Sequence, residues 1–151
     1  HSSFSSFVKQ RIKIRSKHGA VCVEKDQVLR KIFEIKNEGK SGAFAMIADQ
    51  TPRWRNIRHW ARFLNQDTAA FSGTEHIAKK YNFPVYYADI QRVKRGYYHV
   101  TFTPIALEPK ETAENEITDT FMSMLEQHIQ ARPEFWLWSH KRWKHKREET
   151  N

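Results

Sequence analysis

The chain ends with a segment that mixes aromatic and basic side chains: Ala131-Arg132-Pro133-Glu134-Phe135-Trp136-Leu137-Trp138-Ser139-His140-Lys141-Arg142-Trp143-Lys144. Tryptophans are interleaved with cations here, and residues 141–147 carry five lysines and arginines in seven positions. Indole rings favour places with one apolar and one wet edge, and ammonium and guanidinium groups favour phosphate. The composition of this segment therefore suits either a phospholipid headgroup layer or nucleic acid.

The order of residues in this segment resembles the C-terminal signature of the late, lauroyl/myristoyl-type lipid A biosynthesis acyltransferases, Pro-Glu-x-aromatic-x-Trp-x-His-(Arg/Lys)-Arg-(aromatic)-Lys. The resemblance implies a lysophospholipid acyltransferase-like enzyme without a bound cofactor. Such an enzyme moves a fatty acyl chain from acyl carrier protein or coenzyme A to a lipid A precursor or related lysolipid. The resemblance also implies a place at the cytoplasmic face of the bacterial inner membrane, in glycolipid and lipopolysaccharide biosynthesis. The expected membrane or phosphate contacts are Trp136, Trp138, Lys141, Arg142, Trp143 and Lys144.

Length and charge limit the possibilities further. A chain of 151 residues has the size of one domain, and a net charge of +9 predicts an anionic partner. Apolar runs such as 43–48 are far shorter than the roughly 20 residues of a membrane-spanning helix. The single cysteine, Cys22, is expected in a buried strand. The start of the chain has the look of an internal cut, so we expect residues 1–151 to be the C-terminal part of an acyltransferase domain.

Hydrophobic periodicity predicts an alternation of helices and strands. Helices are expected from Phe4 to near Gly19, from Asp26 to Gly39, from Ser72 to Pro84 and over Ile117–Ile129; strands are expected at Ala20–Glu24, Ala43–Ala48, Val85–Gln91 and Tyr97–Ala106. Ser72 and Glu75 fit a capping box, and Lys94-Arg95-Gly96 reads as a hairpin turn. The order predicts an α/β fold with a mixed, mainly parallel sheet flanked by helices. This is also the glycerolipid acyltransferase-like fold that the resemblance implies.

The candidate substrate site begins after the predicted strand Ala43–Ala48. Ligands of parallel sheets bind beyond the carboxyl ends of strands, where Asp49 and Gln50 lie. An Asp before Pro52 is equally typical of a turn, but the acyltransferases carry Asp-Gln or Asp-His at this point. Arg53 opens an arginine- and tryptophan-rich run that either grips phosphates or is a solvated cationic loop.

Two further stretches join the predicted site. The segment Ser72-Gly73-Thr74 opens a helix whose free N–H groups suit an anion, although without the resemblance these residues would be ordinary caps. Arg15 matches a basic position that follows the catalytic motif of the family.

The catalytic motif of these acyltransferases, His-x4-Asp/Glu, is missing. No histidine of this chain has an acidic residue five positions later, so we expect no catalytic residue in it and no activity from it alone. His140 and His145 lack a cysteine or carboxylate at ligand spacing, so no metal is expected. The competing interpretation is a basic nucleic-acid-binding module, supported by interleaved tryptophans and arginines but by no known binding motif.

Overall fold

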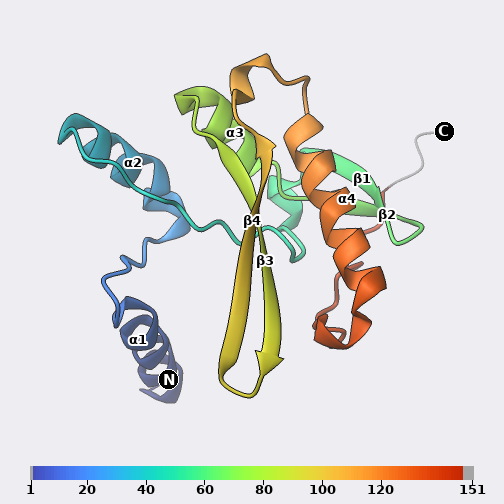
Figure 1. Ribbon diagram of the computed structural model, residues 1–151, viewed down its shortest axis with the longest axis horizontal. Helices are drawn as coiled ribbons and strands as arrows, with labels where there is room; N and C mark the ends of the chain where they lie inside the picture. The colour runs from blue at the N-terminus through green and yellow to red at the C-terminus, as the bar shows by residue number, and fades with distance from the viewer. Residues whose placement is uncertain (1, 148–151) are drawn as a thin grey trace. The chain divides into compact units, whose positions relative to one another are not determined.

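The chain divides into two compact units, His1–Phe44 and Ala45–Asn151. The computed structural model describes residues 2–147 (Figure 1). The N-terminal unit contains helices α1 (Ser2–Ser16) and α2 (Val28–Asn37). Both were predicted, and each is followed by a glycine with positive φ, Gly19 at +86° and Gly39 at +66°. The left-handed backbone, which glycine adopts without strain, ends a helix.

The strand expected at Ala20–Glu24 does not form. This segment has no regular secondary structure, and Cys22 is exposed instead of buried in a core. The strand expected at Ala43–Ala48 is likewise irregular. Apolar, β-branched residues favour strands only where a neighbouring strand accepts their backbone hydrogen bonds. Within residues 2–147, strand pairing is confined to two hairpins that include neither segment.

The C-terminal unit contains these two hairpins and two helices. Strands β1 (His59–Phe63) and β2 (Gln66–Ala70) form one hairpin, and β3 (Val85–Lys94) and β4 (Tyr97–Ala106) form the other. Helix α3 (Gly73–Tyr81) lies between the hairpins in sequence, and α4 (Glu116–Ala131) follows them. Short 3₁₀ turns occupy Lys25–Gln27, Trp54–Asn56, Pro109–Glu111 and Pro133–Phe135. The hairpin β3–β4 and α4 confirm the sequence predictions, whereas β1–β2 was not predicted.

The prediction of a mixed, mainly parallel sheet is wrong for the part of the chain described. Both sheets are two-stranded and antiparallel. Each pair of strands is joined by two residues, too few for the crossover that parallel neighbours require. Leu64 and Asn65 both have positive φ, 47° and 62°, which suits the tight reversal between β1 and β2. Two of the strands predicted for that sheet, Ala20–Glu24 and Ala43–Ala48, do not form.

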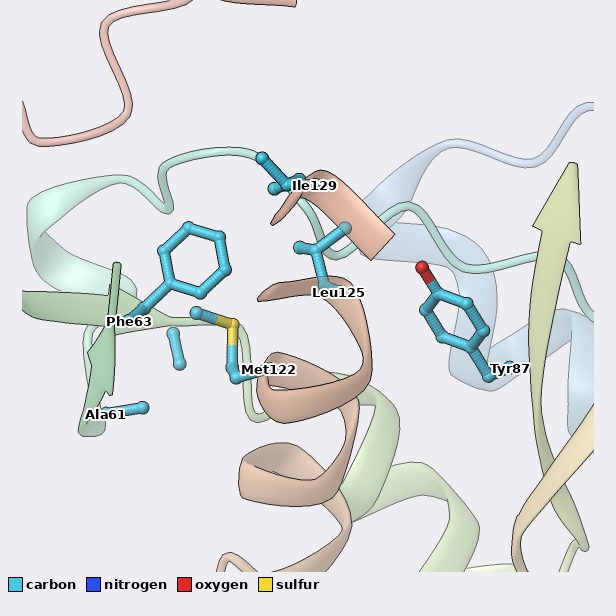
Figure 2. Packing of buried hydrophobic residues seen from close by; sticks show 7 residues of the cluster. Ala61, Phe63, Tyr87, Met122, Leu125 and Ile129 are labelled. Carbon is cyan, nitrogen blue, oxygen red and sulfur yellow. The ribbon is translucent and has the colours of Figure 1, made fainter. Parts of the chain in front are cut away.

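Helix α4 supplies the centre of the core. Met122, Leu125 and Ile129 repeat at helical spacing and are at most 7% exposed. Figure 2 shows them with Phe63 of β1 on one side of the helix and Tyr87 of β3 on the other. Because one helix packs against strands of both hairpins, it fixes the end of β2 and the start of β3 in a single core.

The prediction that Ser72 and Glu75 form a capping box at the start of α3 is also wrong. Ser72 is the N-cap residue but makes no capping hydrogen bond through its side chain. Glu75 is 5% exposed and accepts hydrogen bonds from the backbone N–H of Thr118 at 3.0 Å and from its hydroxyl at 2.6 Å. Thr118 lies in the first turn of α4, whose N–H groups have no partner within the helix. Glu75 therefore caps α4 from the neighbouring helix.

Candidate functional site around Asp49

The segment Asp49–Pro52 is held by the C-terminal segment of the chain. The backbone N–H of Thr51 donates to Nε2 of His140 at 3.1 Å. The hydroxyl of Thr51 donates to the carbonyl oxygens of Lys141, at 3.0 Å, and Arg142. Nε2 of His145 lies 3.2 Å from the carbonyl oxygen of Pro52. These contacts join two segments about ninety residues apart in sequence. The sequence analysis had predicted a functional role for each of them separately.

Arg142 is buried beside this segment. Only 2% of the residue is exposed, and its Nη2 donates to the carbonyl oxygen of Ala69 at 2.9 Å. Its guanidinium carbon lies 5.7 Å from the centre of the Phe63 ring. Burial lowers the pKa of Arg142 to about 10, and the negative charge of Asp49 acts in the opposite direction. Arg142 is therefore a buried cation, held against Ala69 of β2 and joined through its carbonyl oxygen to Thr51.

Trp143 attaches the C-terminal segment to strand β2 as well. Its indole N–H donates to the hydroxyl of Thr68 at 2.8 Å, and its ring centre lies 6.3 Å from that of Phe63. The ring centre of Trp136 lies 6.4 Å from that of Phe63. Since β2 ends at Ala70, just before Ser72, the C-terminal segment fixes the approach to α3 as well as Asp49–Pro52.

A cluster of ionisable side chains lies where β3 meets the end of α4. Oδ1 of Asp89 lies 2.9 Å from Nδ1 of His128, and Oδ2 lies 3.4 Å from Nη2 of Arg132. The hydroxyl of Tyr87 lies 3.5 Å from the same Nδ1 of His128. Burial raises the pKa of Tyr87 to about 12; the charges of Asp89 and Asp49 add to this rise, and that of Arg132 opposes it. The charge of Asp49 thus contributes to the pKa shifts of both Tyr87 and Arg142.

Sequence analysis missed Tyr87, Asp89 and Arg132 as site candidates. A usable signal was present, because Tyr87 and Asp89 are two residues apart on one face of a predicted strand. His128 and Arg132 are one helical turn apart at the end of α4. What the sequence did not show is that these two faces meet.

The predicted substrate residues are distributed as follows. Asp49 is half-buried, Gln50 and Arg53 are exposed, and Ser72, Gly73 and Thr74 form the start of α3. Arg15 is exposed on α1 in the N-terminal unit. The structure thus joins Asp49 to the C-terminal segment, and the substrate-binding role of all seven residues stays a prediction.

The six residues predicted to contact membrane or phosphate fall into two groups. Trp138, at 56% exposure, and Lys141 and Lys144 are exposed. Trp136 and Trp143 are half-buried against Phe63, and Arg142 is buried. Only the exposed group has its side chains at the surface, and for that group the contact stays a prediction.

A surface cleft lies elsewhere, between β1 and α4. Its volume is about 390 Å³, and its lining is His59, Trp60, Ala61, Arg62, Asp119, Ser123 and Glu126. Nε2 of His59 and Oδ1 of Asp119 are 2.6 Å apart there. None of the substrate residues predicted from the sequence lines it.

Two further properties concern residues 2–147 only. They contain no group of three or more His, Cys, Asp or Glu side chains that could hold a metal ion. No helix within the same range is both long and apolar enough to cross a membrane.

The antiparallel hairpins around α4 define an α+β protein in which the C-terminal segment, with its buried Arg142, holds the segment Asp49–Pro52. The sequence profile described as "Bacterial lipid A biosynthesis acyltransferase" matches residues 1–145. The chain belongs to this family. No curated protein matches the chain in a sequence comparison.

Proposed function

We propose that this chain takes part in moving a fatty acyl group from acyl carrier protein or coenzyme A to a lipid A precursor or a related lysolipid, at the cytoplasmic face of the inner membrane. Membership of the acyltransferase family supports acyl transfer as the reaction class. The attachment of Asp49–Pro52 to the C-terminal signature is the observation that carries the finer proposal. It joins the segment that carries the half-buried Asp49 to the backbone of the buried Arg142 and leaves the basic residues Lys141 and Lys144 exposed.

The catalytic pair is proposed to come from protein outside these 151 residues, because no histidine here has an acid at the required spacing. In that arrangement the external histidine removes the proton from the acceptor hydroxyl as it attacks the thioester. Asp49 orients the acceptor or a basic group of the site. Ser72, Gly73 and Thr74 offer helix N–H groups to an acidic part of the substrate. No cofactor is required for this chemistry.

Replacement of Asp49 in the complete enzyme tests this role. Asp49→Asn should keep the fold and reduce turnover by roughly 10²-fold, the scale of a positioned polar group lost from a site. A carboxylate that only stabilises the turn would behave differently, with a loss of about 1 kcal/mol in stability and normal turnover per folded molecule. Asp67→Asn, at an exposed position of β2, is the matched control.

The isolated chain gives a second test. Incubated with acylated carrier protein and a lipid A precursor, it should form no product above background. Robust turnover would show that the catalytic base lies within the chain and would overturn this assignment. The nucleic-acid alternative is not adopted because the chain belongs to the acyltransferase family.

A further inference from the structure

The turn end of the hairpin β3–β4 extends past the helix that supports it. Tyr87 and Asp89 of β3 face α4, and Oδ2 of Asp89 lies 3.4 Å from Nη2 of Arg132, the residue that follows this helix. Beyond this contact the strands continue to a turn at residues 95–96, and every residue from 92 to 104 is exposed. Figure 1 shows the turn end projecting past α4.

Large apolar side chains cover this exposed end. Val93 is 70% exposed, and Tyr97 and Tyr98 are 61% and 63% exposed. The face of the hairpin turned away from α4 continues the apolar surface, since Ile90 and Val100 are paired across the strands and both are exposed. A contiguous apolar patch left open to water usually marks an interaction site.

The same end of the hairpin is basic. Its three cations are Arg92, Lys94 and Arg95, and no Asp or Glu lies between Asp89 and Glu108 in the sequence. A local excess of positive charge without a neighbouring acid attracts anionic surfaces. Charge complementarity therefore indicates an anionic partner for this patch.

The basic side chains lie among the aromatic ones. Nζ of Lys94 lies 4.3 Å from the ring centre of Tyr97, and Cζ of Arg92 lies 5.6 Å from that of Phe135. Phe135 is itself exposed and belongs to the C-terminal segment, as does the exposed Trp138. Arg92 thus links the hairpin to the segment for which the sequence predicts a membrane contact.

We propose that the turn end of the hairpin, residues 92–98, inserts into the headgroup layer of an anionic lipid bilayer. Tyrosine rings suit this layer because they are apolar along the ring and polar at the hydroxyl, and lysine and arginine meet the lipid phosphates. The exposed aliphatic side chain of Val93 favours lipid, since nucleic acid offers phosphates and base rings but no hydrocarbon layer. This contact goes beyond the proposed function and does not depend on acyl transfer.

Binding to vesicles of phosphatidylcholine and phosphatidylglycerol in equal parts tests the proposal. Each basic side chain near an anionic surface contributes a factor of about five at low salt. Lys94→Gln together with Arg95→Gln should therefore weaken binding roughly 20-fold, and high salt should remove the difference. Val93→Ser together with Tyr98→Ser should weaken binding roughly tenfold at low and high salt alike, because salt does not screen the burial of apolar surface.

A matched control removes the same charge from the opposite end of the same unit. Lys80→Gln together with Lys110→Gln replaces two exposed cations, on α3 and on the 3₁₀ turn Pro109–Glu111. This variant should bind within about twofold of the native chain, since charges far from the surface are screened. Equal losses in the hairpin variant and this control would overturn the proposal, because binding would then follow net charge alone.

A fluorescent label locates the contact without removing a charge. In a Cys22→Ser background, the environment-sensitive fluorophore NBD is attached through Val93→Cys or, as the control, through Lys110→Cys. On anionic vesicles the label at position 93 should brighten and shift to the blue, and the label at position 110 should not. Vesicle binding with an unchanged label at position 93 would overturn the proposal and leave the C-terminal segment as the membrane contact.

Other partners for the hairpin give distinct results. Tighter binding to single-stranded RNA than to the vesicles, lost in the Lys94 and Arg95 variant, would overturn the proposal in favour of nucleic acid. A dimer in analytical ultracentrifugation that the Val93 and Tyr98 variant dissociates would overturn it in favour of a second copy of the chain. Each measurement omits the acyl donor, so failure of this proposal and failure of the proposed function are distinguishable.

Discussion

Removal of the Glu75 carboxylate should be among the most damaging single changes outside the apolar core. This side chain lies on α3, is 6% exposed, and contacts the first turn of α4 through Thr118. Nζ of Lys79 lies 3.2 Å from its other oxygen. Glu75→Ala therefore leaves the N–H and hydroxyl of Thr118 and the ammonium of Lys79 without this partner.

The magnitude follows from these contacts. A hydrogen bond to a charged group contributes about 1.5–3 kcal/mol, and water entering the site recovers part of the loss. We expect Glu75→Ala to cost about 3 kcal/mol of unfolding free energy. Glu75→Gln should cost roughly 1 kcal/mol, because its amide oxygen still accepts from Thr118 but the negative charge at the helix N-terminus is gone.

The pH dependence gives a second readout. Burial alone would raise the pKa of Glu75, but the hydrogen bonds from the Thr118 hydroxyl and backbone, and from Lys79, outweigh it and lower the pKa below 4.5. A carboxyl with a lowered folded-state pKa binds its proton more readily in the unfolded chain. Its stabilising contribution is thus fully present above pH 4.5 and is lost as the pH falls below it through the folded-state pKa. Glu75→Gln should lack this part of the acid sensitivity.

Urea unfolding followed by circular dichroism at neutral and acid pH measures both effects. Glu114→Ala is the control, because Glu114 is exposed just before the N-cap of α4. Surface substitutions of this kind change stability by about 0.5 kcal/mol or less. If Glu75→Ala behaved like Glu114→Ala, the assignment of Glu75 as the cap of α4 would be refuted.

Three other outcomes are expected. Trp143→Phe should cost about 1 kcal/mol by loss of the 2.8 Å hydrogen bond to Thr68, and should add almost nothing in a Thr68→Val background; an additive cost would contradict that bond. In an ultraviolet titration, Tyr87 should ionise only near pH 12. Because its pKa is higher in the folded chain than in the unfolded chain, the free energy of unfolding should fall as the pH rises above 10, and Tyr87→Phe should lack this fall. Lys141→Gln and Lys144→Gln should each weaken binding to anionic vesicles by about 1 kcal/mol at low salt, and equal binding to neutral vesicles would argue against a lipid surface.

Local patterns were sufficient to predict the second half of the fold. Tyr97–Ala106 alternates and follows a Gly96 turn, and the apolar spacing in 117–129 has a clear helical period. Such elements can be predicted from local sequence, because the backbone hydrogen bonds of a hairpin or helix are made within a short stretch of chain. The capping residues were harder. Glu75 has the spacing of a local cap, yet its carboxylate is closer in space to α4 than any sequence rule indicates.

The missed hairpin and the unformed strands have a common cause. The composition of Ala43–Ala48 is typical of a strand, but a strand forms only when a neighbouring strand accepts its backbone hydrogen bonds. The sequence of one segment does not show which other segment will pair with it. In β1 the signal was masked by charge: Ala61 and Phe63 face the core while Arg62 faces outward. The sequence analysis interpreted the run that contains Arg62 as either a phosphate-binding segment or a solvated cationic loop. The turn at Leu64-Asn65 also lacks the glycine that usually marks a hairpin.

The C-terminal segment shows why charge counting is a poor guide to a site. Lys141 and Arg142 are adjacent cations, and composition treats them alike. The structure exposes the first and buries the second, because the carbonyl oxygens of this segment bond to Thr51 and turn the Arg142 side chain toward Ala69 and Phe63. Guanidinium suits this position better than ammonium, since its flat, weakly hydrated group can lie over an aromatic ring and still present several donors. A signature that suggested a membrane contact is therefore, in part, an internal attachment of Asp49.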